Sequence, residues 1–211
     1  MKYTVFDIET IGLPDELLPP FDESTVAVGN LKDPEKIKAK IDDARAEWRK
    51  TLALSPLTGQ VAMVGFMDDT GQSTISSGDE LSIVTVALER IIVALIDGQV
   101  VAGFNSFSFD LPFLLKRAWT MKLAIPTDLR VRIRGRTYWH ENLVDLRDEW
   151  LMGDRAPAKG TSSLESVARF LGLPEKLGNG SEFAGMTPDE RKAYLLRDLE
   201  ITLALYRRII P

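Results

Sequence analysis

A chain of 211 residues, 45% of them hydrophobic, is long enough to bury one substantial core, so a single domain over residues 1–211 is expected. The absence of cysteine excludes disulfides, thiolate metal sites and a cysteine nucleophile, and without any sign of an oxidising compartment the expected location is the cytoplasm. The net charge of −5 argues against broad electrostatic coating of DNA, which needs many Lys and Arg contacts with phosphates, but not against an enzyme that grips one strand end.

Residues 2–9 are predicted to form a central strand, because apolar side chains occur on both of its faces until the acids begin. Side chains alternate along a strand, so Asp7 and Glu9 project from the same face at its end. Two unpaired carboxylates that end an apolar strand are costly unless a cation or water receives them. Their position makes them candidates for a metal site.

The next part of the chain alternates between helices and strands. Residues 14–32 are rich in proline and acid and are expected to be loop, and Asp33-Pro34 predicts the start of a helix to about residue 54. Strands are predicted at 61–67, 73–76 and 100–104, and helices at 81–96 and 110–123. The longest apolar stretch, 81–96, contains charged residues and is too short to cross a bilayer, so no membrane partner is expected.

Asp110 lies where the strand at 100–104 leads into the following helix. An acid in the first turn of a helix is favoured by the macrodipole, so taken alone Asp110 is explained as a stabilising charge.

Four arginines alternate in the segment 130–136, namely Arg130, Arg132, Arg134 and Arg136. A strand over this segment would place all four on one face. We interpret that face as an edge that contacts the phosphates of a single-stranded substrate. The alternative is a solvated, charged edge strand that resists aggregation.

The last part of the chain is predicted to contain a fifth strand at 138–146 and helices at 163–171 and 187–209. Thr187 and Glu190 have the spacing of a capping box at the start of the final helix. Tyr194 and Asp198 are four residues apart on that helix and share one face, although in isolation they are explained as a half-buried tyrosine beside a surface acid. The element order favours an α/β three-layer fold with a mixed five-stranded sheet.

Taken together, the order of these motifs resembles the DEDD superfamily of 3′→5′ exonucleases. The tyrosine form of the last motif is similar to the DEDDy branch, and most of all to the proofreading exonuclease domains of family B DNA polymerases and their stand-alone relatives. The matching segments are 6–10, 103–112, 144–146, 163–173 and 194–198. Residues 14–60 look like a helical insertion in that domain.

The resemblance implies an RNase H-like fold and a two-metal-ion exonuclease that releases nucleoside 5′-monophosphates from the 3′ end of a single strand, with DNA favoured over RNA. Asp7 would bridge two Mg²⁺ or Mn²⁺ ions, for which oxygen ligands are suitable. Glu9 and Asp198 would complete the site of the attacking water, and Asp110 would hold the second ion mainly through water. Tyr194 would orient the attacking water.

The same resemblance places the backbone of Thr10 and the side chains of Asn105 and Phe107 near the terminal nucleotide, with a core position as the alternative for Phe107. The implied partners are single-stranded DNA or RNA 3′ ends, together with a DNA polymerase or the DNA repair machinery. One alternative function is a catalytically idle exonuclease-fold module that binds nucleic acid or a polymerase. Another is an RNase H-like nuclease that cuts internally.

His140 and Asp145 have the H-x-x-x-x-D spacing of the histidine branch of the superfamily, whose histidine acts as general base. They lie on a predicted strand soon after Asp110, and two further helices are predicted after them. The segment Val144-Asp145-Leu146 also matches a strand of the DEDDy branch, which accounts for Asp145. We therefore prefer Tyr194 and Asp198 as the third motif.

Overall fold

The computed structural model describes residues 2–125, 129–133, 136–178 and 180–210. The chain divides into two compact units, one made of residues 1–9 with 61–211 and the other of residues 10–60. No helix in the described parts of the chain is long and apolar enough to cross a membrane.

Five strands form the main sheet, in the order β3-β2-β1-β4-β7. They are β1 (Tyr3–Gly12), β2 (Gly59–Asp68), β3 (Ser73–Ser77), β4 (Val100–Gly103) and β7 (Leu143–Asp145). β4 pairs in parallel with both β1 and β7, whereas β2 and β3 form an antiparallel pair, so the sheet is mixed. The predicted α/β fold with a mixed five-stranded sheet is confirmed.

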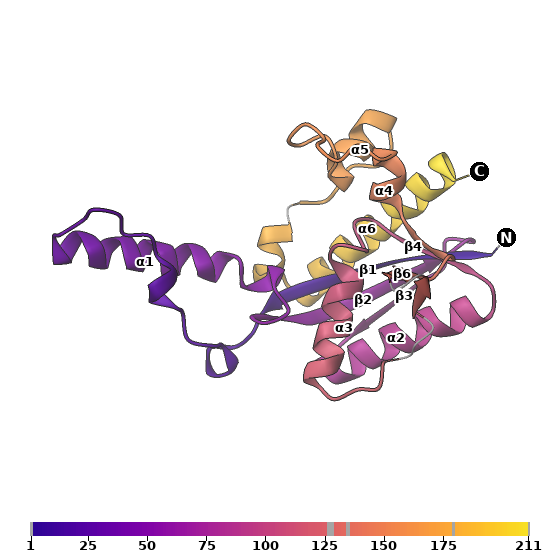
Figure 1. The fold of residues 1–211 in the computed structure, drawn as a ribbon. Helices are drawn as coiled ribbons and strands as arrows, with labels where there is room; N and C mark the ends of the chain where they lie inside the picture. The colour runs from indigo at the N-terminus through magenta and orange to yellow at the C-terminus, as the bar shows by residue number, and fades with distance from the viewer. Residues whose placement is uncertain (1, 126–128, 134–135, 179, 211) are drawn as a thin grey trace. The chain divides into compact units, whose positions relative to one another are not determined.

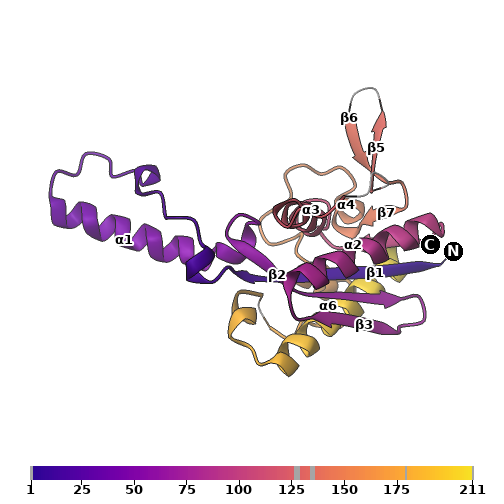
Figure 2. The same ribbon diagram turned by 90° about the horizontal axis from the view of Figure 1, so that it is seen from below.

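Helices cover both faces of this sheet (Figures 1 and 2). On one face, Phe6 and Ile8 of β1 join the hydrophobic core with residues of α2 (Glu80–Ile96) and α3 (Asp110–Thr120). On the other face, α6 (Pro188–Ile209) approaches Gly65 of β2 closely. Because side chains alternate along β1, Asp7 and Glu9 point away from the face that carries Phe6 and Ile8.

Two shorter helices, α4 (Leu146–Leu151) and α5 (Leu164–Leu171), pack against α6. The predicted capping box at the start of α6 is confirmed, because Thr187 and Glu190 each satisfy the backbone N–H of the other. α5 begins with a similar box and ends at Gly172, which has the left-handed conformation expected of a helix end.

The interpretation of residues 130–136 as one strand is wrong. The segment contains β5 (Arg130–Ile133), which pairs with β6 (Arg136–Trp139) as an antiparallel two-stranded sheet. The prediction for Arg134 lies outside the described residues. Among the described residues, Arg130 and Arg132 lie on β5 and Arg136 lies on β6, so these three arginines belong to both arms of a hairpin and not to one strand. The strand predicted at 138–146 is likewise divided between β6 and β7, and α4 follows β7 directly.

The second unit contains α1 (Pro34–Lys50), which begins where it was predicted, with the Asp33 carboxylate accepting a hydrogen bond from the backbone N–H of Glu35. None of its residues is buried. The chain continues as a short 3₁₀ helix, Leu52–Leu54, and the Thr58 hydroxyl donates to the carbonyl of Leu52.

The contact between β2 and α6 depends on a glycine. A Cβ atom at Gly65 would lie 2.6 Å from Cδ1 of Leu199 and 3.1 Å from Cγ of Leu195. We expect Gly65→Ala to lower the free energy of unfolding by about 1 to 3 kcal/mol, since the two leucines must shift. Urea unfolding measures this change, with Gly185→Ala as the matched control because no atom lies within 4 Å of a Cβ there. An equal effect of the two substitutions would contradict close packing at Gly65.

Candidate metal centre

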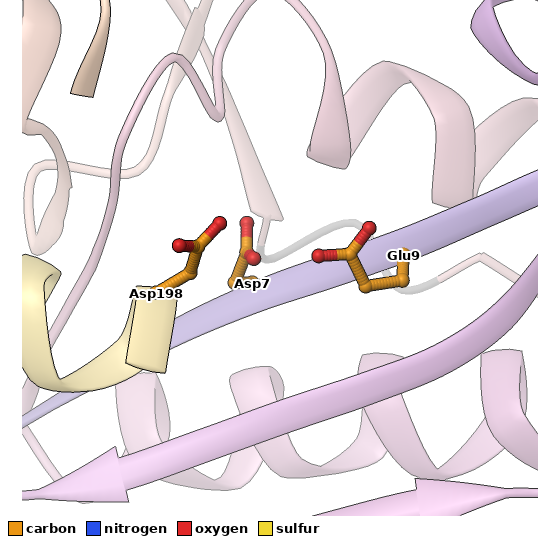
Figure 3. Close-up of side chains that lie close together, drawn as sticks. All are labelled: Asp7, Glu9 and Asp198. Atoms are coloured by element: carbon orange, nitrogen blue, oxygen red, sulfur yellow. The ribbon is translucent and has the colours of Figure 1, made fainter. Parts of the chain in front are cut away.

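Three carboxylates from opposite ends of the chain meet in the first unit. Asp7 and Glu9 come from β1 and Asp198 from α6, and one oxygen atom of each lies within 4.8 Å of the others. Figure 3 shows the Asp7 carboxylate between those of Glu9 and Asp198. The pair on β1 follows from strand alternation, whereas Asp198 reaches it because α6 lies close to the sheet.

The two carboxylate oxygens of Asp198 differ in their hydrogen-bond partners. Its side chain is buried, with 4% of the residue exposed. One oxygen, Oδ2, lies 2.6 Å from the ammonium of Lys176, but Oδ1 has no hydrogen-bond partner among the described residues. A buried carboxylate oxygen without a partner is costly unless a cation or water receives it. The oxygen donors present therefore fit a divalent metal ion.

Burial and mutual repulsion raise the pKa values of these acids. Burial is the largest cause for Asp7, Glu9 and Asp198, and it raises the pKa of Glu9 from its ordinary value of 4.5 to about 8. The Asp110 and Glu9 carboxylates raise the pKa of Asp7 further. Lys176 acts in the opposite direction on all three acids. Such a cluster favours a bound cation over its own empty, ionised form.

Asp110 lies beside this group, in the first turn of α3. It is 3% exposed, and its Oδ1 accepts a hydrogen bond of 3.1 Å from the backbone N–H of Ile8. Burial raises the pKa of Asp110 to about 7, against the lowering effects of Ile8 and of a hydrogen bond with Asp7. Among the described residues, Asp110 is not one of the three acids whose oxygens lie within 4.8 Å. It adjoins the site through Asp7.

Tyr194 lies one turn before Asp198 on α6 and is 3% exposed. Its ring packs edge-on against Phe183, with centroids 5.9 Å apart, and the Lys176 ammonium lies 5.2 Å from its ring centroid. Burial, followed by the charge of Asp198, raises the pKa of Tyr194 to about 12. The phenol therefore keeps its proton at neutral pH and can donate a hydrogen bond toward the carboxylates.

A carboxylate organises the loop that contains Asn105 and Phe107. Asp145, at the end of β7, accepts hydrogen bonds of 2.8 Å from the backbone N–H groups of both residues, and a third of 2.9 Å from Arg147. Asn105 has a left-handed backbone (φ 61°), which asparagine tolerates better than most residues. The Phe107 ring stacks on Trp139 at 5.6 Å and packs against the hydrophobic core, which agrees with the alternative interpretation of this residue.

Two other predicted positions have local partners. The Thr10 hydroxyl, in the second unit, donates to the carbonyl of Ala53 at 2.7 Å. His140 lies between β6 and β7 rather than on a strand, and its Nδ1 accepts a hydrogen bond from the backbone N–H of Asn142. His140 does not belong to the carboxylate group in the described part of the chain.

A cleft of about 570 Å³ adjoins the carboxylates. Its walls include Asp7, Asn105, Ser108, Arg147, Ser163, Lys176 and Asp198. The Arg147 guanidinium is held by the carbonyl and hydroxyl oxygens of Ser162. Lys176 and Arg147 were not predicted from the sequence. Lys176 lies in a loop without periodicity, and Arg147 lies on a six-residue helix too short to give a helical pattern.

The raised pKa values predict how stability depends on pH and metal. Native carboxyls with raised pKa values hold protons that the unfolded chain has lost, so without metal the free energy of unfolding should fall from about pH 4.5 to about pH 8. At about pH 8, Mn²⁺ at ~100 times its Kd should raise the melting temperature by about 5 to 10 °C. Melting curves at both pH values, with and without Mn²⁺, test this. A rise in metal-free stability with pH, or indifference to Mn²⁺, would contradict a metal centre built from these acids.

No protein-family model matches the sequence, and no curated protein matches it significantly. Among solved structures, the chain is similar to the family B DNA polymerase from the hyperthermophilic archaeon Pyrobaculum calidifontis, with a TM-score of 0.62 and 21% sequence identity. The match covers 100% of this chain and 24% of that one, so the chain spans about a quarter of the polymerase's length. This likeness concerns the fold, and the three-layer arrangement around a mixed sheet agrees with the predicted RNase H-like class.

Proposed function

We propose that this chain is a two-metal-ion 3′→5′ exonuclease of the DEDDy type that acts on the 3′ end of single-stranded DNA. The observation that carries the proposal is the group of Asp7, Glu9 and Asp198, in which one buried carboxylate oxygen has no partner among the residues that the structure describes. The structural likeness to a family B DNA polymerase supports it. On this proposal, residues 1–211 are one exonuclease domain in which 14–60 is an insertion.

The four acids Asp7, Glu9, Asp110 and Asp198 would hold two Mg²⁺ or Mn²⁺ ions. When bound, such ions stabilise the entering and leaving oxygens of an in-line displacement at phosphorus. The protonated phenol of Tyr194, next to Asp198 on α6, would orient the attacking water. Water adds to phosphorus, the bond from phosphorus to the 3′ oxygen of the preceding nucleotide breaks, and that oxygen takes up a proton. The product is a nucleoside 5′-monophosphate.

The loop at Asn105 and Phe107 would receive the terminal nucleotide. Asp145 fixes the backbone of this loop with two hydrogen bonds, so Asn105 is held at the wall of the cleft that Asp7 also lines. By the resemblance to the exonuclease family, the backbone of Thr10 is also proposed to contact the terminal nucleotide. A site held by rigid backbone hydrogen bonds positions a strand end without requiring broad positive charge, in agreement with the net charge of −5.

The proposal is tested with 5′-labelled single-stranded DNA and RNA, each with Mg²⁺ and with Mn²⁺. We expect a ladder of products shortened from the 3′ end, release of nucleoside 5′-monophosphates, and faster degradation of DNA. A labelled circular DNA of the same composition should remain intact, because it has no 3′ end. Cleavage of the circle would indicate an internal nuclease, and tight binding without turnover would indicate a binding module. Either result would overturn the proposal.

A further inference from the structure

A lysine lies among the carboxylates of the candidate metal centre. Lys176 belongs to the loop between α5 and α6, and its Nζ is 2.6 Å from Oδ2 of Asp198. Its side chain is only 19% exposed, and that of Asp198 is 6% exposed. The ammonium also faces the ring of Tyr194 at 5.2 Å, so it lies between the two residues that form the third motif.

This ammonium remains charged in its partly buried position. Burial alone would lower the pKa of Lys176, but the Asp198 carboxylate outweighs that effect and raises the pKa above its ordinary value. The charge lies 2.6 Å from Oδ2 of Asp198, and one oxygen of Asp198 lies within 4.8 Å of oxygens of Asp7 and Glu9. One ammonium therefore acts on all three acids of the group, whereas an ordinary surface ion pair involves two side chains.

The two oxygens of Asp198 are in different situations. Oδ2 is paired with Lys176, whereas Oδ1 is buried and has no partner in the described part of the chain. A divalent ion that takes up Oδ1 would share one carboxylate with the ammonium, and two cations on one carboxylate repel each other. Without a metal, the ammonium is the cation that offsets the acids.

We propose that Lys176 is a resident counter-cation of this site, which stabilises the metal-free fold and opposes the binding of divalent ions. This inference rests on the proposed function, since it concerns the same four acids. Lys176 thereby raises the stability of the metal-free protein and lowers its affinity for divalent ions. A purely structural ion pair, which only fastened the loop to α6, would affect stability but would not weaken metal binding.

The test compares Lys176→Met with wild type in two measurements that do not depend on turnover. Calorimetric titration with Mn²⁺ should give a Kd at least about tenfold lower for Lys176→Met, because repulsion between two close cations is of that size even when screened as in bulk water. Melting curves should show a lower melting temperature than wild type without metal, and a smaller difference at saturating Mn²⁺.

Two further variants separate charge from other effects. Lys176→Arg keeps the charge, so its Mn²⁺ affinity should remain within about threefold of wild type. Lys192→Met makes the same substitution at an exposed position of α6 and should leave both measurements unchanged. If Lys176→Met is unfolded without metal, Mn²⁺ is expected to restore its native circular dichroism, and failure to do so would count against the proposal.

The outcomes distinguish this inference from the proposed function. If wild type binds Mn²⁺ as tightly as Lys176→Met or more tightly, the role of Lys176 as a counter-cation is wrong, but the proposed function is not affected. Equal tightening by Lys176→Arg would also overturn this role, because the charge would then not be the cause. Wild type that binds no Mn²⁺ at all would overturn both the metal centre and the role of Lys176.

Discussion

Replacing Asp7 or Asp198 with alanine is expected to reduce nucleotide release by a factor of about 10³ or more. Each substitution would remove a ligand of the metal ions, and these ions supply several kcal/mol of transition-state stabilisation. The loss should not result from unfolding. Asp7 has a raised pKa in the native state, so its removal relieves repulsion and a desolvation cost. Asp198→Ala leaves the Lys176 ammonium with the charges of Asp7 and Glu9, so it should lower the melting temperature without unfolding the chain. The rate is measured on 5′-labelled single-stranded DNA at saturating Mg²⁺.

The matched control is Asp189→Ala, which removes an exposed acid from the first turn of the same helix that carries Asp198. This variant should retain the wild-type rate. Melting curves of all three variants without metal confirm that the chain is folded. If Asp7→Ala or Asp198→Ala keeps near-normal activity, the assignment of metal ligands is wrong.

The second large effect concerns Tyr194. We expect Tyr194→Phe to slow nucleotide release by a factor of about 10 to 1,000, the range for losing one catalytic hydrogen-bonding group. The phenylalanine ring would keep the edge-on contact with Phe183, so stability should change little. His140→Ala should leave the rate near that of wild type, because the His140 ring accepts a local hydrogen bond from the backbone N–H of Asn142 and lies outside the carboxylate group of the described residues.

The comparison of Tyr194→Phe with His140→Ala also separates the two branches of the superfamily. If His140→Ala is inactive and Tyr194→Phe is active, the third motif consists of His140 and Asp145 and not of Tyr194 and Asp198. Asp145, however, already accepts three backbone hydrogen bonds, from Asn105, Phe107 and Arg147. If both variants remain active, the role of Tyr194 in orienting water is wrong.

Local patterns in the sequence predicted much of the fold. The alternation along residues 2–9 was sufficient to place Asp7 and Glu9 on one face, and the capping box at Thr187 located the start of α6. The hairpin of β5 and β6 was missed because a period-two pattern looks the same whether one strand or two paired strands carry it. Helix α4 was missed because six residues give less than two helical turns.

The site required information that local patterns do not contain. Asp198 lies near Asp7 because α6 packs on the sheet, with Leu195 and Leu199 close to Gly65, which is a matter of tertiary packing. Lys176 comes from a loop, where no spacing rule relates a residue to its neighbours in space. The order of the motifs predicted which acids belong to the site, but the three-dimensional arrangement is needed to show that one oxygen of Asp198 has no partner within the described ranges.

The carboxylate group joins the first strand of the chain to its last helix, and this has a consequence for protein synthesis. β1 leaves the ribosome early, but the group cannot form until α6 has emerged and packed on the sheet. A growing chain would therefore carry Asp7 and Glu9 without Asp198 and could not assemble the proposed centre. Metal binding by this group is therefore expected to begin only once α6 has packed on the sheet.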